Sequence, residues 1–313
     1  MRKLIKKIPF ISGLFHSLRP YHTGNVTENK IGLQVVRVLG LHFSQSMRGG
    51  NNVSKNNEDN LKALKKDGII EFKKFLSDED WNKVIKEYND YKDKLVFQPY
   101  KPAEKFSMEV AKIEVNKLPQ YFPSTIQIMG NNVILNELAC SILHLNPKKI
   151  KPSLSYLILR KNNNNDLDDD IENILHADVH YRTVKAFLYM NPATSHNGAY
   201  IYAKGSNKLN LARLRFEYNM SVRVAKLKRG DTDIAPEYIE KRGNLLRNII
   251  SEKQRKEMKI NEIQYSGDAN TLVLSDNFGF HRRGEFEPNQ IRETLIVNYR
   301  NEQTGWLRRF LNK

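Results

Sequence analysis

Short segments rich in Tyr, Val, Ile and Leu dominate the second half of the chain and limit the folds that it can adopt. Clusters of Asn, Gly, Pro and Ser separate successive segments, which is typical of strands joined by turns. The segments are 153–160, 183–190, 199–203, 271–275 and 294–299. Because most of them follow one another without an intervening helix, we expect antiparallel sheets in a double-stranded β-helix, or jelly roll.

Helical patterns flank these strands on the N-terminal side. A short helix from Leu61 should end at Gly68, with a brief strand at 69–72 and a second helix after it. Ser77 is a good N-cap for the second helix, since its hydroxyl can accept a bond from a free backbone N–H. The apolar residues that recur at helical spacing behind it predict its core face. They are Trp81, Val84, Ile85 and Tyr88.

Two polar stretches suggest how the chain is organised. Residues 44–60 contain a glycine pair and no apolar period, so we interpret 1–60 as a basic N-terminal arm and polar linker. Residues 61–313 then form the jelly-roll domain. Within it, 208–262 is polar and charged, and we expect a helical insertion, with a helix starting at Pro236, that covers the mouth of the barrel.

A single cysteine, Cys140, bears on the compartment and on the kinds of site that are available. One cysteine excludes an internal disulfide framework and a cysteine zinc cluster. It fits a reducing environment, and we expect a cytoplasmic protein. The 40% hydrophobic content of the 313-residue chain predicts a folded protein with a substantial core.

The charge balance is strongly basic. Lys and Arg number 51 against 35 Asp and Glu, a formal charge of +16, which suits an anionic partner such as nucleic acid, a membrane surface or a phosphate-bearing substrate. Residues 1–20 combine a basic head with a short apolar stretch. This segment could contact a membrane surface, or it could simply pack against the domain. The excess positive charge of the chain could also have no function.

The sequence "ILHADVHYR" carries the strongest chemical signal. His176, Asp178 and His180 alternate along an extended segment and would therefore share one face. His281 follows a later strand, and Arg292 begins the next one. Two histidines and one carboxylate on a jelly roll form the facial triad of non-haem Fe(II) oxygenases, which leaves three coordination positions open.

Several segments in the same order resemble the phytanoyl-CoA dioxygenase family of Fe(II)/2-oxoglutarate-dependent oxygenases, whose core is cupin-like. The resemblance runs from about Leu61 to Arg300 and leaves the first 60 residues and the 208–262 insertion outside or poorly matched. The matching segments are "LKKDGIIEFKKFLSDEDWNKVIKEY", "LHADVHYRTVKAFLYMNPATSHNGAYIYAKGSNK" and "SGDANTLVLSDNFGFHRRGEFEPNQIRETLIVNY".

The resemblance implies a set of roles. His176, Asp178 and His281 would bind Fe(II), Arg292 would bind the C5 carboxylate of 2-oxoglutarate, and Thr294 would assist it. O₂ is the co-substrate, with ascorbate as the expected reductant. Related halogenases replace the carboxylate with a small residue, so Asp178 favours hydroxylation. His180 should then lie beside the iron site rather than bind the metal.

The substrate is less constrained than the reaction. We expect a small, anionic organic molecule, such as an acyl-CoA, a nucleotide-linked metabolite or a lipid- or glycan-linked one. Residues expected to line the pocket are His180, Tyr181, Arg182, Arg282 and Arg283.

Alternative functions are a non-catalytic metal-binding jelly-roll protein and a nucleic-acid-directed dioxygenase. Nucleic-acid-directed dioxygenases have a second Arg six residues after the first one. Counted from Arg292, this position in the chain is Asn298. The chain also lacks interleaved aromatic and basic residues that would stack on bases. No feature of the sequence indicates the oligomeric state.

Overall fold

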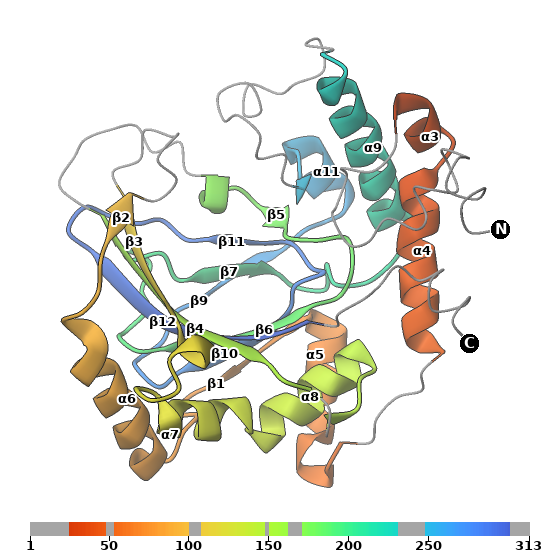
Figure 1. Ribbon diagram of the computed structural model, residues 1–313. Coiled ribbons are helices and arrows are strands. Elements are labelled where there is room, and N and C mark those ends of the chain that lie inside the picture. Colours follow the sequence, from red (N-terminus) through yellow and green to blue (C-terminus); the bar gives the residue numbers. More distant parts are fainter. Residues whose placement is uncertain are drawn as a thin grey trace, which may run out of the picture.

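Two antiparallel sheets lie face to face in the computed structural model, and helices cover their outer faces (Figure 1). The structure describes residues 25–47, 53–99, 108–147, 150–161, 171–230 and 248–300. The prediction of a mostly β jelly roll with flanking helices is confirmed, although the sheets form an open sandwich and not a closed barrel. The basic segment 1–20 and the predicted start of a helix at Pro236 lie outside the described residues.

The larger sheet has seven strands and carries the main hydrophobic core on its outer face. Along β12, Leu295 and Val297 point into this core, so Thr294 and the other alternate residues point toward the smaller sheet. In spatial order the strands are β1 (Ile69–Phe72), β10 (Leu272–Asp276), β6 (Val184–Tyr189), β12 (Ile291–Tyr299), β4 (Ser153–Lys161), β3 (Met108–Glu114) and β2 (Gln98–Pro99).

The smaller sheet has five strands, and all described pairings are antiparallel. Their order is β8 (Asn248–Ile249), β5 (His176–Ala177), β11 (His281–Arg283), β7 (Tyr200–Ala203) and β9 (Glu262–Tyr265). The sequence also places Ile249 on the apolar face of the helix expected from Pro236, and this prediction is wrong, because Ile249 pairs with His176 across the edge of the sheet. That pairing provides backbone hydrogen bonds for an edge that β5 would otherwise expose.

Helices α5 (Glu58–Asp67), α6 (Asp78–Lys92) and α8 (Val133–Leu143) contribute to the core outside the larger sheet, and α7 (Pro123–Thr125) follows the core residue Phe122. Gly68 ends α5 with φ +80°, a left-handed conformation that favours glycine. The Ser77 hydroxyl accepts a 3.2 Å hydrogen bond from the Asp80 N–H, as expected of an N-cap, and Val84 and Tyr88 are fully buried. Shorter turns are η1 (Lys55–Asn57), η2 (Val115–Lys117), η5 (Ile171–Asn173) and the π-helical η3 (Ile126–Gly130).

The described part of the insertion covers the outer face of the smaller sheet. It does not cover the mouth of a barrel, although the sequence led us to expect this. Helix α9 (Leu211–Lys228) packs Phe216 against Ala177 and Phe280, and α11 (Glu252–Glu257) lies beside it (Figure 1). Helix α9 also contacts α3 (Val26–Lys30) and α4 (Leu33–Ser46), so residues 26–46 belong to the folded body. The division of the chain at residue 60 stays a prediction.

A buried polar network joins α4 to α9. The Arg213 Nε donates to Glu217 Oε1 at 2.9 Å, and Gln34 Nε2 donates to Glu217 Oε2 at 3.1 Å. Arg37 in turn donates to Gln34 at 2.7 Å, and all four side chains are almost fully buried. A buried charge pair needs such additional hydrogen bonds to offset the cost of removing both charges from water. None of the described helices has the length and hydrophobicity that a membrane span requires.

Candidate metal centre

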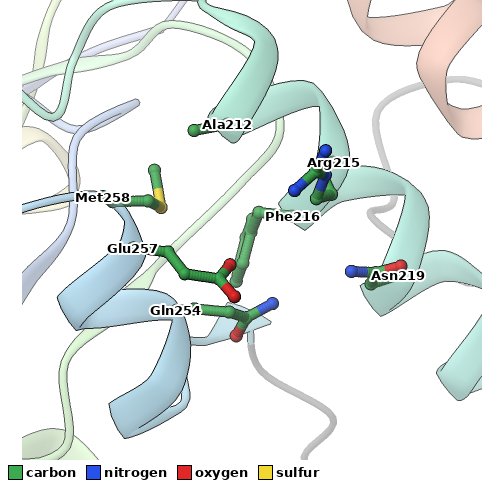
Figure 2. A pocket seen from close by; sticks show the side chains of 7 residues that line it. All are labelled: Ala212, Arg215, Phe216, Asn219, Gln254, Glu257 and Met258. Atoms are coloured by element: carbon green, nitrogen blue, oxygen red, sulfur yellow. The ribbon is translucent and has the colours of Figure 1, made fainter.

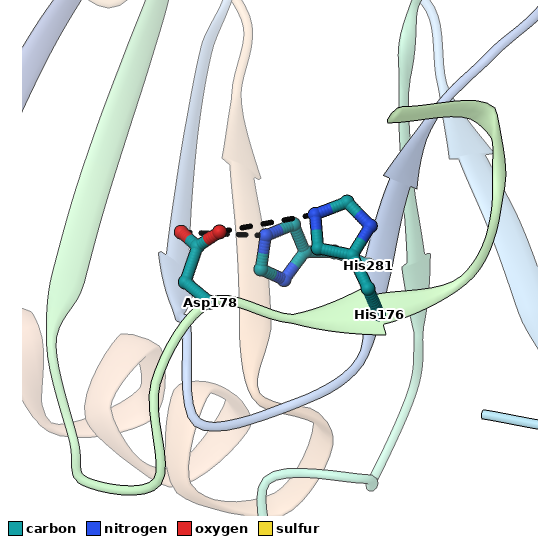
Figure 3. A group of neighbouring side chains, drawn as sticks. All are labelled: His176, Asp178 and His281. Carbon is teal, nitrogen blue, oxygen red and sulfur yellow. Dashed lines mark ion pairs between the residues drawn. The ribbon is translucent and has the colours of Figure 1, made fainter. Parts of the chain in front are cut away.

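The three predicted ligands come together between the two sheets. The antiparallel register of β11 and β5 sets His281 directly opposite His176, and Asp178 follows two residues later in the chain. One ligand atom from each of the three lies within 4.8 Å of the others (Figure 3). His176 Nε2 is 3.8 Å from Asp178 Oδ1, and His281 Nε2 is 3.6 Å from Asp178 Oδ2. The sequence motif therefore folds into a compact cluster of metal-ligating atoms.

Backbone carbonyls orient both imidazoles. His176 Nδ1 lies 2.7 Å from the Ile174 carbonyl oxygen, and His281 Nδ1 lies 3.1 Å from that of Gly279. In both histidines the Nδ1 atom faces a carbonyl oxygen, so the Nε2 atom is the one that faces Asp178. Histidine ligands of protein metal sites are commonly held by this kind of bond on the other nitrogen.

The cluster lies on the inner face of the smaller sheet. The neighbouring residues Ala177 and Phe280 point outward into the core beneath α9, so His176 and His281 point inward. The His281 ring also lies 5.5 Å from the ring of Tyr200, a residue of the apolar cluster between the sheets. The two imidazoles are 2% and 7% exposed, whereas the Asp178 carboxylate is 27% exposed. The open side of the cluster is therefore the side of the carboxylate.

Lys185 is a member of the site that sequence reasoning missed. Its Nζ lies 2.5 Å from Asp178 Oδ2, and Asn277 Nδ2 donates to the same oxygen at 3.3 Å. Burial alone would raise the pKa of Asp178, but Lys185, His281 and His176 outweigh it and hold that pKa well below its usual range. In the sequence, Lys185 is visible only as a lysine in the middle of the apolar segment 183–190. Its neighbours Val184 and Ala186 belong to the outer core, so Lys185 points toward the inside of the sandwich.

A second carboxylate approaches the cluster without joining it. Glu172 Oε2 lies 3.6 Å from His176 Nε2, but Glu172 is outside the group whose ligand atoms all lie within 4.8 Å. The compact set among the described residues is thus two histidines and one aspartate.

Arg292 and Thr294 share the inner face of β12. The Arg292 guanidinium donates to the carbonyl oxygen of Gly198, whose φ of +77° belongs to a tight turn. Thr294 is 3% exposed, lies opposite Tyr189 in the register, and its hydroxyl has no hydrogen-bond partner among the described residues. A guanidinium and a buried hydroxyl on one face can together bind a carboxylate.

His180 is fully buried and is not part of the compact cluster. Burial, with the positive charges of Arg37 and Arg213, holds the pKa of His180 well below its usual range, so the imidazole is neutral. Its ring packs edge-on against Tyr181 with centroids 5.5 Å apart. Tyr181 is itself 8% exposed, which leaves it little contact with solvent.

The three arginines expected around the pocket have different environments. Arg182 donates to Asp276 at 2.6 Å, and Arg282 donates to Glu262 at 2.5 Å, so a carboxylate already balances each of these charges. Arg283 is 5% exposed and lies on the inner face with His281, 5.8 Å over the Phe286 ring. Because successive side chains of a strand point to opposite faces, Arg282 lies on the outer face of the smaller sheet and Arg283 on the inner face.

A cavity of about 350 Å³ between α9 and α11 lies behind the metal-ligating strands (Figure 2). Its wall includes Phe216, which packs on the outer face of the smaller sheet, and it contains both Arg215 and Glu257. The sheet therefore separates this cavity from the triad.

Comparisons with known proteins support the fold. No family model and no curated protein matches the chain. The epimerase SnoN in complex with Fe3+, alpha ketoglutarate and nogalamycin RO is 12% identical, with a TM-score of 0.50 over 80% of this chain and 87% of that one. EctD from S. alaskensis with bound Fe is 12% identical, with a TM-score of 0.47 over 80% of each chain. HygX from Streptomyces hygroscopicus with nickel, 2-oxoglutarate and hygromycin B is 11% identical, with a TM-score of 0.46 over 78% of this chain and 87% of that one. At this identity, the similarity to SnoN identifies the fold of the present chain.

Proposed function

We propose that the protein is an Fe(II)- and 2-oxoglutarate-dependent dioxygenase that hydroxylates a small anionic organic molecule. The observation that carries this proposal is the cluster of His176, Asp178 and His281 on the inner face of a jelly roll. The order of motifs that resembles the phytanoyl-CoA dioxygenase family supports it, and so does the shared fold with an epimerase that binds iron and alpha ketoglutarate. Membership of that family is part of the proposal.

The donor set suits Fe(II). Two imidazoles and one carboxylate are the ligands of the facial triad, and both Nδ1 atoms already lie against backbone carbonyls. Iron, with 2-oxoglutarate and O₂, supplies the oxidising power for hydroxylation, and 2-oxoglutarate ends as succinate and CO₂. Lys185 and Asn277 hold Asp178 Oδ2, so the carboxylate keeps one orientation toward the two Nε2 atoms.

The residues of β12 fit the distal carboxylate of 2-oxoglutarate. Arg292 would pair with its two oxygens through the guanidinium fork, and the Gly198 carbonyl restrains the arginine from the other side. The Thr294 hydroxyl, which is buried and has no hydrogen-bond partner among the described residues, would donate to the same group. A carboxylate at this position would relieve the cost of burying an unsatisfied hydroxyl.

Substrate recognition would depend on Arg283 and Tyr181 more than on the other candidates. Arg283 shares the inner face with His281, and burial together with the nearby Asp178 carboxylate raises the pKa of Tyr181. Arg182 and Arg282 would contribute less, because Asp276 and Glu262 already balance them. Acyl-CoA and nucleotide-linked metabolites carry phosphates that an arginine of this kind would bind, and so do lipid- or glycan-linked metabolites that bear a phosphate or carboxylate.

The test combines a binding measurement with turnover. Purified protein with Fe(II) and 2-oxoglutarate, kept free of O₂, should develop the charge-transfer absorption of an Fe(II)–2-oxoglutarate complex. With O₂ and ascorbate, a screen of anionic metabolites should identify one that stimulates succinate release. Iron binding without either signal would instead support a non-catalytic metal-binding protein.

A further inference from the structure

A cavity of about 220 Å³ at the C-terminal end of α4 contains none of the triad residues. Its walls come from α4, α5, α8 and the segment between β5 and β6. The lining residues are His42, Gln45, Ser46, Lys65, Ser141, Ile142, His144 and Arg182. Only Ile142 among them is apolar, so the cavity is not a defect of the hydrophobic core.

The lining has one sign of charge. Lys65 and Arg182 are cations, and no Asp or Glu lines the cavity in the part of the chain that the structure describes. A concave site whose wall charges are all positive raises the local concentration of anions. The cavity between α9 and α11 differs in this respect, because Arg215 and Glu257 both line it.

Two buried polar atoms in the wall lack a partner. Gln45 is 3% exposed, and its side-chain Nε2 has no hydrogen bond to any described residue. The same holds for His42 Nε2. Burial, with Arg182 and Arg213 nearby, lowers the pKa of His42 to about 3, so this imidazole is neutral. A buried donor without a partner destabilises the folded protein, and a hydrogen bond to an oxygen of a ligand would remove that cost.

Arg182 is held in place before any ligand arrives. Its Nη1 donates to Asp276 Oδ2 at 2.6 Å, and its Nη2 donates to the Asn207 carbonyl at 3.3 Å. A guanidinium has five N–H donors, so the two bonds to Asp276 and Asn207 leave others available. Its side chain is 21% exposed, which keeps it accessible.

We propose that this cavity, here called the α4 pocket, binds a small oxyanion, namely a phosphate or carboxylate group. Gln45 would donate its buried amide to the anion, and Lys65 would balance its charge. Arg182, whose own charge Asp276 balances, would donate a remaining N–H. The volume is below the roughly 300–1,000 Å³ typical of drug-sized ligands, which fits a small anion or the anionic end of a larger molecule. The α4 pocket is independent of the proposed 2-oxoglutarate site, because it shares no residue with the triad, Arg292 or Thr294.

Calorimetric titration of the full-length, metal-free protein with inorganic phosphate at low ionic strength tests the proposal, and malonate in a parallel titration tests the carboxylate. We expect saturable binding of one anion per chain. Saturation by phosphate alone would indicate a phosphate-bearing ligand, and saturation by malonate alone would indicate a carboxylate-bearing one. No saturable binding of either would overturn the proposal.

Four variants test where the anion binds. Lys65→Glu and Gln45→Leu should each weaken the anion by about tenfold or more, the usual effect of losing a hydrogen bond to a charged group. Lys66→Glu is the matched control, since this exposed neighbour on α5 does not line the α4 pocket, and it should change affinity less than twofold. The assignment would be overturned if Lys66→Glu lost as much anion affinity as Lys65→Glu. It would also be overturned if Arg292→Ala lost anion affinity and Lys65→Glu did not. Failure of iron or 2-oxoglutarate to bind would leave these results unaffected.

Discussion

The two faces of the smaller sheet differ in the chemistry that they carry. Along β11 and the residue before it, Phe280 points outward beneath α9, His281 points inward to the triad, and Arg282 points outward to Glu262. Arg283 then points inward again. Under the proposed function, adjacent residues would therefore serve separate tasks, stability on the outer face and chemistry on the inner one. Substitutions at neighbouring positions should have effects of different kinds.

The largest effect is expected from Asp178→Ala on the inner face. Loss of the only carboxylate of the compact cluster should weaken Fe(II) by more than the 10–100-fold or so typical of changes around a metal site, and should abolish substrate hydroxylation. Metal content after dialysis and succinate release measure the two consequences. Glu172→Gln is the control and should keep its iron, because Glu172 lies outside the cluster.

His180→Ala gives a second control for the same prediction. The variant should lose thermal stability, since it removes a fully buried side chain, yet the folded fraction should still bind iron. Loss of iron on His180→Ala together with its retention on His281→Ala would mean that the third ligand is misassigned.

Phe216→Ala, on the helix that covers the outer face, should lower the free energy of unfolding and leave the KM of the folded protein unchanged. Removing a buried phenylalanine typically costs about 3–5 kcal/mol, which urea unfolding would measure. Leu211→Ala on the same helix should cost almost nothing, because Leu211 is 85% exposed. A changed KM in folded Phe216→Ala protein would contradict the separation of the two faces.

Arg292→Ala tests the larger sheet's contribution to the inner space. Truncating one partner of a buried charge pair costs roughly 2–5 kcal/mol, so the Kd for 2-oxoglutarate should rise at least about 30-fold. Iron affinity should stay unchanged, since Arg292 is not a ligand. Anaerobic titration followed by the charge-transfer absorption measures both. An unaltered Kd for 2-oxoglutarate would remove Arg292 from the proposed site.

The smallest effect separates Arg283 from Arg282. Arg283→Met should raise the KM for an anionic substrate by about tenfold, the loss of one charge-assisted hydrogen bond. Arg282→Met should leave KM nearly constant, because Arg282 is paired with Glu262 on the outer face. The reverse order of effects would show that the substrate approaches from outside the sandwich.

Much of the fold follows from local patterns. The predicted segments 153–160, 183–190 and 271–275 correspond to β4, β6 and β10, and the Ser77 cap and the stop at Gly68 occur where expected. Strand β8 was misassigned because its pairing partner is remote in sequence, and periodicity cannot report such a partner. The packing of α9 on the outer face also depends on remote contacts.

The candidate site was predictable to a similar degree. His176, Asp178 and His281 come together as the motif indicates, whereas Lys185 escaped notice. An isolated lysine in an apolar strand gives no hint of its partner until the turn after Asp178 brings the two side chains together. The pairing of Arg182 with Asp276 was hidden for the same reason, since 94 positions separate them.

The buried network between α4 and α9 has a practical consequence for dissecting the molecule. A chain cut back to Leu61, at the boundary suggested by composition, would remove Gln34 and Arg37 and leave Glu217 and Arg213 facing water. Such a fragment should aggregate or unfold, even though every motif survives in it. We therefore expect the smallest fragment that folds on its own to include α3 and α4.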